Sequence, residues 1–251
     1  MKNNNKQRWI IGSILVPFII GLIWTAFKWA DYNSYLSINR IQIQGASIIE
    51  PQEYLELLGD ITDTPIAQIK LDEIRSAIEA HPYVRATRVS RHYPNTIKIE
   101  LVERQPIAMV NIPPMVLIDA EGVVLPETDN TINPQLPCLS NFNPAKQLYP
   151  VGEQALSQKV IEATKIVTQI RRKYPSLYRN LSEVRLNHRE EYELILSEEP
   201  TRIVLGSDDI WFKLLILKEF ERSITPLRKL TDYTYLDLRY ENQVIAREKH
   251  V

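Results

Sequence analysis

Residues 81–108 read HPYVRATRVSRHYPNTIKIELVERQPIA, and the first half of the chain is organised around this stretch. Two β-rich runs, Val84–Arg91 and Thr96–Glu103, are separated by four residues whose Pro and Asn favour a turn. In the second run apolar and charged residues alternate, so one face is expected to be buried and the other to meet solvent. The stretch therefore predicts a β-hairpin with one buried face.

The segment before the hairpin predicts one strand and two helices. Ile38–Gln44 alternates apolar with polar residues, which is typical of a half-buried strand. A short helix is expected to open at Pro51 and stop at Gly59, and a second helix to cover Leu71–Ala80. The order strand, helix, helix, strand, strand predicts an α+β fold in which two helices pack on one face of a three-stranded sheet.

This region resembles a POTRA domain, and its amino-acid sequence resembles that of the bacterial cell-division protein family FtsQ/DivIB. The resemblance is carried by HPYV at 81–84, RHYPNTI at 91–97 and VERQPIA at 102–108. On this basis we assign residues 38–108 to a POTRA domain. A component of protein export or outer-membrane assembly is an alternative, but such proteins usually carry POTRA domains in tandem, and the sequence holds no second copy of the motif.

A membrane anchor is expected before this domain. Trp9–Phe27 is an uncharged stretch of 19 residues, which as a helix would be about 28 Å long, close to the ~30 Å thickness of the hydrocarbon layer. We therefore predict a transmembrane helix at 9–29 and a linker at 30–37. Basic residues without acids precede the span, so residues 1–8 are expected in the cytoplasm and the rest outside. A cleaved signal peptide is disfavoured because the stretch is long and lacks small residues at its end.

The remaining residues, 109–251, predict a second, mostly antiparallel β domain with flanking helices. LIDAEGVVL at 117–125 reads as a tight hairpin and resembles the hairpin that opens the second domain of the family. Residues 126–150 are rich in Pro and Asn and predict a long irregular connection, in which LPCL at 136–139 resembles a short family strand. A helix is expected over Ser157–Tyr174, because Pro175 prevents its continuation.

The last 70 residues predict further strands around one helix. Strands are expected at 182–187, 192–197, 202–206, 234–240 and 243–247. The helix is predicted to be capped by Asp208 and to bury five apolar side chains, Trp211, Leu214, Leu215, Leu217 and Phe220. In the strand 234–240, Tyr235, Asp237 and Arg239 alternate with Leu236, Leu238 and Tyr240, so we expect the first three to face solvent.

The sequence offers no arrangement typical of an enzyme. Its four His residues lack metal-ligand spacing, the single Cys138 allows neither an internal disulfide nor a common zinc set, and no glycine-rich phosphate loop is present. We therefore predict no cofactor, metal or small-molecule substrate. Asp119 and Glu121 could be paired catalytic carboxylates of an extracytoplasmic cell-wall hydrolase, but their place in a tight turn explains them better. Residues 31–251 hold 26 basic and 31 acidic side chains, a net charge of −5, which argues against a nucleic-acid partner.

The resemblance implies a non-catalytic divisome scaffold, anchored by a single helix in the plasma membrane and concentrated at the division septum. It implies that extracytoplasmic domains recruit the septal peptidoglycan synthesis machinery, and that the carboxy-terminal part binds proteins of the FtsB/FtsL type by strand addition. YLDLRY at 235–240 resembles the closing strand of the family. By resemblance, the partner contact is expected on Tyr235, Asp237, Arg239, Tyr240, Gln243 and Val244.

Overall fold

The computed structural model describes residues 15–26, 28–29, 36–128, 136–241 and 243–249. These residues divide into two compact units; the second takes residues 81–83 and everything from residue 103 onward. No helix in the described part of the chain has the length and apolarity needed for a membrane span. The predicted span at 9–29 falls partly outside the described residues, because 9–14 and 27 are not among them.

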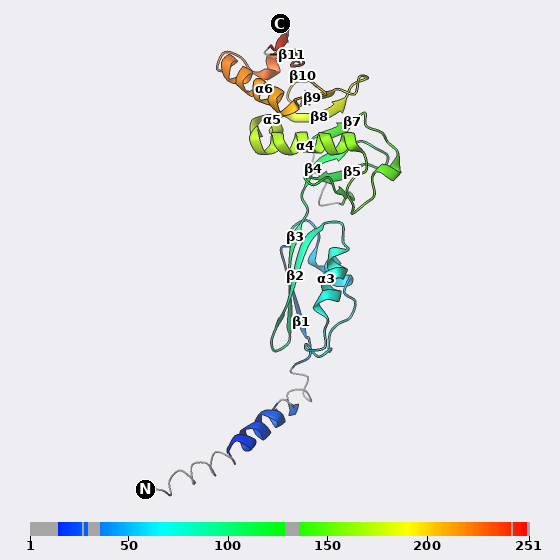
Figure 1. Ribbon diagram of the computed structural model, residues 1–251, viewed down its shortest axis with the longest axis vertical. Helices are drawn as coiled ribbons and strands as arrows, with labels where there is room; N and C mark the ends of the chain where they lie inside the picture. Colours follow the sequence, from blue (N-terminus) through cyan, green and yellow to red (C-terminus); the bar gives the residue numbers. More distant parts are fainter. Residues whose placement is uncertain (1–14, 27, 30–35, 129–135, 242, 250–251) are drawn as a thin grey trace, which may run out of the picture. The chain divides into compact units, whose positions relative to one another are not determined.

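The first unit has the predicted order of elements. Strand β1 (Arg40–Gln44) is followed by helices α2 (Pro51–Glu56) and α3 (Leu71–Glu79) and by strands β2 (Val84–His92) and β3 (Thr96–Glu103). The sheet order is β1-β3-β2, with β1 parallel to β3. Helix α3 covers one face of this sheet (Figure 1). The alternation read from the sequence is confirmed, because Ile97, Ile99 and Leu101 are buried.

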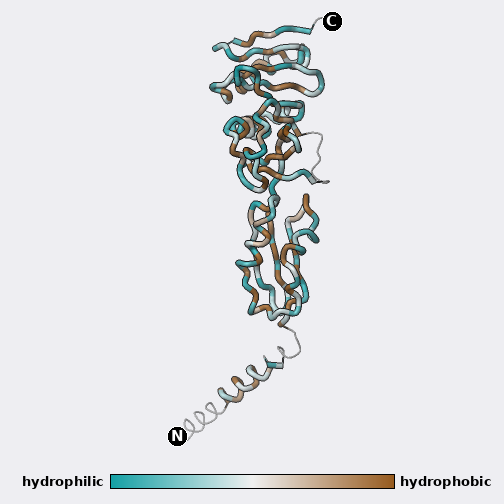
Figure 2. The backbone as a smooth tube through the Cα atoms, turned by 90° about the vertical axis from the view of Figure 1, so that its right-hand side faces the viewer, coloured by the Kyte–Doolittle hydropathy of each residue, from teal (hydrophilic) through white to brown (hydrophobic). Residues whose placement is uncertain are grey.

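The second unit is built on one sheet of nine strands in the order β12-β11-β10-β9-β8-β7-β4-β5-β6. Five of the eight neighbouring pairs are antiparallel and three are parallel. Its strands carry many hydrophobic residues (Figure 2). The strands are β4 (Pro106–Val110), β5 (Val116–Asp119), β6 (Val124–Leu125), β7 (Cys138–Ser140), β8 (Leu181–Leu186), β9 (Tyr192–Leu196), β10 (Arg202–Gly206), β11 (Tyr233–Asp237) and β12 (Ile245–Glu248).

Helices α4 (Gln158–Lys173) and α6 (Ile210–Ile224) pack against this sheet and against each other (Figure 1). Helix α4 buries the apolar stripe that the sequence predicts, including Val160, Val167 and Ile170. Pro175 ends α4 and also occupies the first turn of a short helix, α5 (Pro175–Arg179), which was not predicted. Two 3₁₀ turns lie at Lys146–Leu148 and Leu230–Asp232.

Two predictions about α6 are wrong. Its N-cap is Asp209, in a left-handed conformation without a side-chain cap, whereas Asp208 lies one residue earlier. Only one narrow stripe of the helix faces the sheet, so Leu214 and Leu217 are buried together with Lys213, while Leu215 is 42% exposed. Trp211 and Phe220 are only partly buried. The Lys213 amine finds its partners locally, because it donates to the Asp208 carbonyl over 2.7 Å and forms an ion pair with the Asp208 carboxylate at 3.4 Å.

Candidate partner interface

One end of the nine-stranded sheet is an open edge. Strand β12 is the last strand in the sheet order, and all four of its residues are exposed. It pairs antiparallel with β11, placing Arg247 opposite Tyr235 and Ala246 opposite Leu236. Within the described chain no strand lies beyond β12. An edge of this kind presents unpaired N–H and C=O groups on which another chain can form a strand.

The direction of the β12 backbone groups follows from its contacts with β11 and the residues before it. The Lys249 N–H donates to the Asp232 carbonyl, and the Arg247 carbonyl accepts from the Thr234 hydroxyl. Because alternate residues of a strand point their backbone groups to opposite neighbours, Arg247 and Lys249 face inward. The N–H groups of Ala246 and Glu248 therefore face the open side.

The six residues expected to contact a partner cluster around the β11–β12 pair. Tyr235 and Asp237 lie on β11, which ends at Asp237 and is shorter than predicted. Arg239 and Tyr240 follow in the connection to β12, where Tyr240 is 52% exposed. Gln243 and Val244 precede β12; Gln243 is exposed and Val244 is half-buried. A partner contact on these residues stays a prediction.

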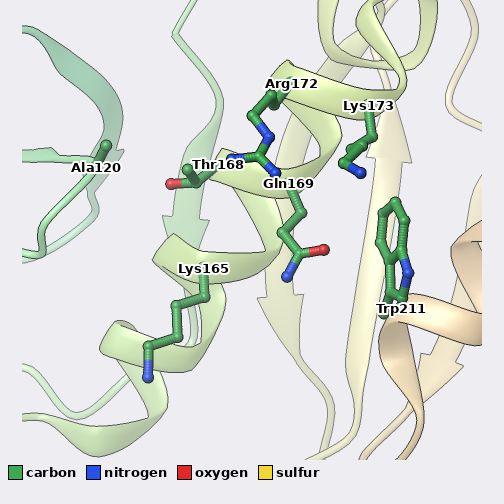
Figure 3. A pocket seen from close by; sticks show the side chains of 7 residues that line it. All are labelled: Ala120, Lys165, Thr168, Gln169, Arg172, Lys173 and Trp211. Atoms are coloured by element: carbon green, nitrogen blue, oxygen red, sulfur yellow. The ribbon is translucent and has the colours of Figure 1, made fainter.

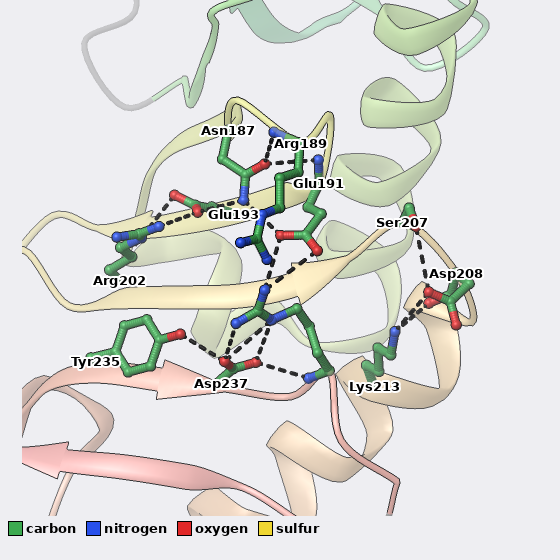
Figure 4. Close-up of polar contacts among 11 residues, drawn as sticks. Asn187, Arg189, Glu191, Glu193, Arg202, Ser207, Asp208, Lys213, Tyr235 and Asp237 are labelled. Atoms are coloured by element: carbon green, nitrogen blue, oxygen red, sulfur yellow. Dashed lines mark hydrogen bonds and ion pairs between the residues drawn. The ribbon is translucent and has the colours of Figure 1, made fainter.

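The prediction that Asp237 meets solvent is wrong, because its side chain is the centre of a polar cluster (Figure 4). Asp237 is 3% exposed. It accepts hydrogen bonds from the Tyr235 hydroxyl at 2.7 Å and from the Arg239 guanidinium at 2.6 Å, and Arg239 also pairs with Glu191 at 3.2 Å. Burial would raise the pKa of Asp237, but the hydrogen bonds from Arg239 and Tyr235 outweigh it and lower the pKa to about 2.

A second buried carboxylate, which the sequence reading did not identify, lies two strands further in. Glu193 on β9 is fully buried. Its oxygens accept hydrogen bonds from Arg202 and Asn187 (Figure 4) and also from Arg185. Burial would raise the pKa of Glu193, yet these donors lower it. The signal was present in the alternation of YELIL at 192–196, but Glu in such a pattern normally indicates a solvent-facing side chain.

The two carboxylates form one polar layer on the sheet. The Arg202 guanidinium that pairs with Glu193 also lies 5.7 Å from the centre of the Tyr235 ring. This layer lies on the sheet face away from the helices, because the preceding residue, Tyr192, donates its hydroxyl to Glu162 of α4. Its hydrogen bonds connect the end of β11 to Arg239, the residue before Tyr240.

Asp119 and Glu121, the alternative catalytic pair, are used by a turn. Asp119 accepts backbone hydrogen bonds from Glu121 and Val123 over 2.9 Å each. The Arg104 guanidinium binds both carboxylates, at 2.7 Å and 2.8 Å. The turn interpretation of these acids is therefore confirmed. Among the described residues no group of His, Cys, Asp and Glu is arranged to hold a metal ion.

The chain matches two families that together cover most of its length. Residues 36–104 match "POTRA domain, FtsQ-type" and residues 105–247 match "FtsQ/DivIB, C-terminal related". A cell division protein FtsQ from Rickettsia felis is 32% identical over 252 residues, covering 91% of this chain and 83% of that protein. The FtsQ of Geotalea daltonii is 25% identical, covering 86% and 77%. The chain therefore belongs to the FtsQ/DivIB family of bacterial cell-division proteins.

Proposed function

We propose that the protein is a non-catalytic scaffold of the divisome that binds proteins of the FtsB/FtsL type along the open edge of β12. The observation that carries this proposal is the exposed strand at the end of the nine-stranded sheet, with Tyr240 beside it. A partner strand paired with β12 would gain backbone hydrogen bonds, and nearby side chains would select it. Through these partners the scaffold would help recruit the septal peptidoglycan synthesis machinery.

The structure of β11 refines which residues would make the contact. Tyr235 and Asp237 lie one strand behind the edge, and the Asp237 oxygens are already occupied by Tyr235 and Arg239. We therefore assign these three residues a positioning role and place direct contact on Tyr240, Gln243, Val244 and β12. Exposed tyrosines are common anchors of protein interfaces.

The membrane arrangement is part of the same proposal. Residues 9–29 would anchor the protein in the plasma membrane, with residues 1–8 in the cytoplasm and both domains outside, at the division septum. The uncharged stretch and the preceding basic residues support this topology. A hydrolase is disfavoured because Asp119 and Glu121 both serve the turn and the Arg104 ion pair.

The proposal is tested by replacing one backbone donor on the open side. Ala246→Pro removes an N–H that faces outward, whereas Ala246→Ser keeps it and is the matched control. We expect the tagged full-length Ala246→Pro protein to be inserted in membranes at normal levels but to lose copurification of FtsB and FtsL, while Ala246→Ser retains it. Normal copurification with the Pro variant would exclude strand addition at β12.

A further inference from the structure

A groove runs along α6 where this helix meets α4, on the other side of the sheet from the polar layer. Its first part is a hollow of about 400 Å³ between Lys165, Arg172 and Lys173 of α4 and Trp211 of α6 (Figure 3). A second hollow of about 160 Å³ shares Lys173 and Trp211 with the first. A third, of about 460 Å³, shares Leu215 with the second. The third hollow is lined by α6 residues alone and adjoins the second at Leu215. We call the three hollows together the helix groove.

The first part of the helix groove is cationic without being neutralised. Lys165, Arg172 and Lys173 are exposed, and among the described residues Lys165 and Arg172 form no ion pair. The Lys173 amine lies 5.6 Å from the Trp211 ring, a cation–π contact that leaves its charge uncompensated. Of the acids on the two helices, Glu219 pairs with Arg222, while Glu162 and Glu221 accept hydrogen bonds from the hydroxyls of Tyr192 and Tyr174.

The stability of the fold explains the presence of these basic residues only in part. Arg172 and Lys173 lie in the last turn of α4, where positive charge complements the helix dipole. However, the carbonyl of Lys173 at that end already accepts a hydrogen bond from Lys218. Lys165 lies in the middle of α4, beyond the reach of this effect. A positive surface of this kind also contrasts with the net charge of −5 over residues 31–251.

The rest of the helix groove is apolar. Phe212 is 55% exposed and Leu215 is 42% exposed, and both line the third hollow with Phe220. The sequence pattern predicts that Leu215 and Phe220 are buried. Phe220 is partly buried against Tyr233, whereas Leu215 and the neighbouring Phe212 stay exposed. Contiguous exposed apolar surface of this kind marks interaction sites in soluble domains.

We propose that the helix groove binds an acidic, amphipathic segment of a partner protein. Carboxylates of the segment would pair with Lys165 and Arg172, which are seven residues apart and so about 10.5 Å apart along α4. Apolar side chains of the same segment would cover Phe212 and Leu215. Charge complementarity selects the acidic partner, and the apolar part selects a polypeptide over a sugar chain or a lipid headgroup. This site is separate from β12 and does not depend on strand addition there.

The proposal is tested by crosslinking in the organism's own cells. A photocrosslinking amino acid at position 212 of the full-length protein is expected to react with a polypeptide segment that carries at least two Asp or Glu residues, as identified by mass spectrometry. The same amino acid at the exposed Leu156 position is the control for non-specific contacts. No crosslink at 212, or a crosslink to a lipid, a glycan or a second copy of this chain, overturns the proposal.

Charge reversal tests the electrostatic part. Lys165→Glu with Arg172→Glu is expected to reduce the yield of the crosslink at least about tenfold. The milder pair Lys165→Gln with Arg172→Gln is expected to reduce it less, and it keeps the test valid if the charge reversal impairs folding. Lys146→Glu with Arg179→Glu changes the same charge at exposed positions that line none of the three hollows and should leave the yield unchanged. A yield that none of the groove variants lowers contradicts the proposal.

Discussion

The two edges of the nine-stranded sheet differ: one is covered by the chain itself and the other is open. At one end β6 has only two residues, both buried, and the chain itself covers it: the Val124 N–H donates to the Glu153 carbonyl and Gly152 donates back to the Val124 carbonyl. At the other end β12 has four exposed residues and nothing beyond it in the described chain. Of the two edges of this nine-stranded sheet, as described, only β12 therefore offers a template for a partner strand.

The largest expected effect is on stability at the closed edge. Val124→Pro removes the N–H that donates to Glu153 and forces a ring into a fully buried position. We expect it to lower the free energy of unfolding by about 3 kcal/mol or more. Urea unfolding of the full-length protein in detergent measures this. A change as small as that of Ala246→Pro at the open edge would remove the contrast between the two edges.

Glu193 tests whether the polar layer behind the open edge is structural. Glu193→Gln keeps the shape but weakens the hydrogen bonds from Arg202 and Arg185, so we expect a loss of about 2 kcal/mol in the free energy of unfolding. The exposed Glu198→Gln on the following loop is the matched control and should be close to neutral. Equal effects of the two variants would mean that the buried carboxylate does not support the sheet.

Tyr240→Ala tests whether the open edge at β12 binds a partner. Because its side chain is exposed, Tyr240→Ala should leave the unfolding free energy nearly unchanged. We expect it to weaken the affinity for FtsB/FtsL-type partners about tenfold or more, a loss of about 1.4 kcal/mol or more. Titration of the purified full-length protein with the partner pair measures the affinity. An unaltered affinity would move the contact away from this side chain.

The last prediction concerns the pH dependence of stability. The folded state lowers the pKa of Asp237 to about 2, from about 3.9 in an unfolded chain. A lowered pKa stabilises the fold above the unfolded value, and this contribution is lost as the pH falls towards 2. The stability advantage of the wild type over Asp237→Asn should therefore shrink between pH 5 and pH 2. A difference that stays constant over this range would show that the Asp237 charge is not stabilised by Arg239 and Tyr235.

Local patterns predicted the elements well, and long-range packing explains where the sequence reading failed. The alternation around Ile97 correctly predicted a strand, and the apolar stripe from Val160 to Ile170 correctly predicted a helix. Both predictions succeed because the periodic spacing of apolar residues along the chain indicates which face is buried. The order of strands is not local, so the sequence could not place β12 outside β11. It also could not show that Arg239 would bind both Asp237 and Glu191, which lies 48 positions before it.

The helix that contains Leu215 illustrates the same limit. Apolar residues surround much of α6, and the sequence alone does not tell which of them face the sheet. The structure buries Leu214 and Leu217 and leaves Phe212 and Leu215 exposed. Family resemblance supplied the candidate partner site, whereas the helix groove became visible only when α4 and α6 were placed side by side.

The central claim, that β12 is a template for a partner strand, is tested most directly by amide hydrogen exchange of the full-length protein with and without an FtsB/FtsL-type partner. We predict that the outward N–H groups of Ala246 and Glu248 exchange at least about tenfold more slowly in the complex, as expected for newly hydrogen-bonded amides. The Val124 N–H at the closed edge should keep its rate. Unchanged exchange at Ala246 and Glu248 in a fully formed complex would contradict the account.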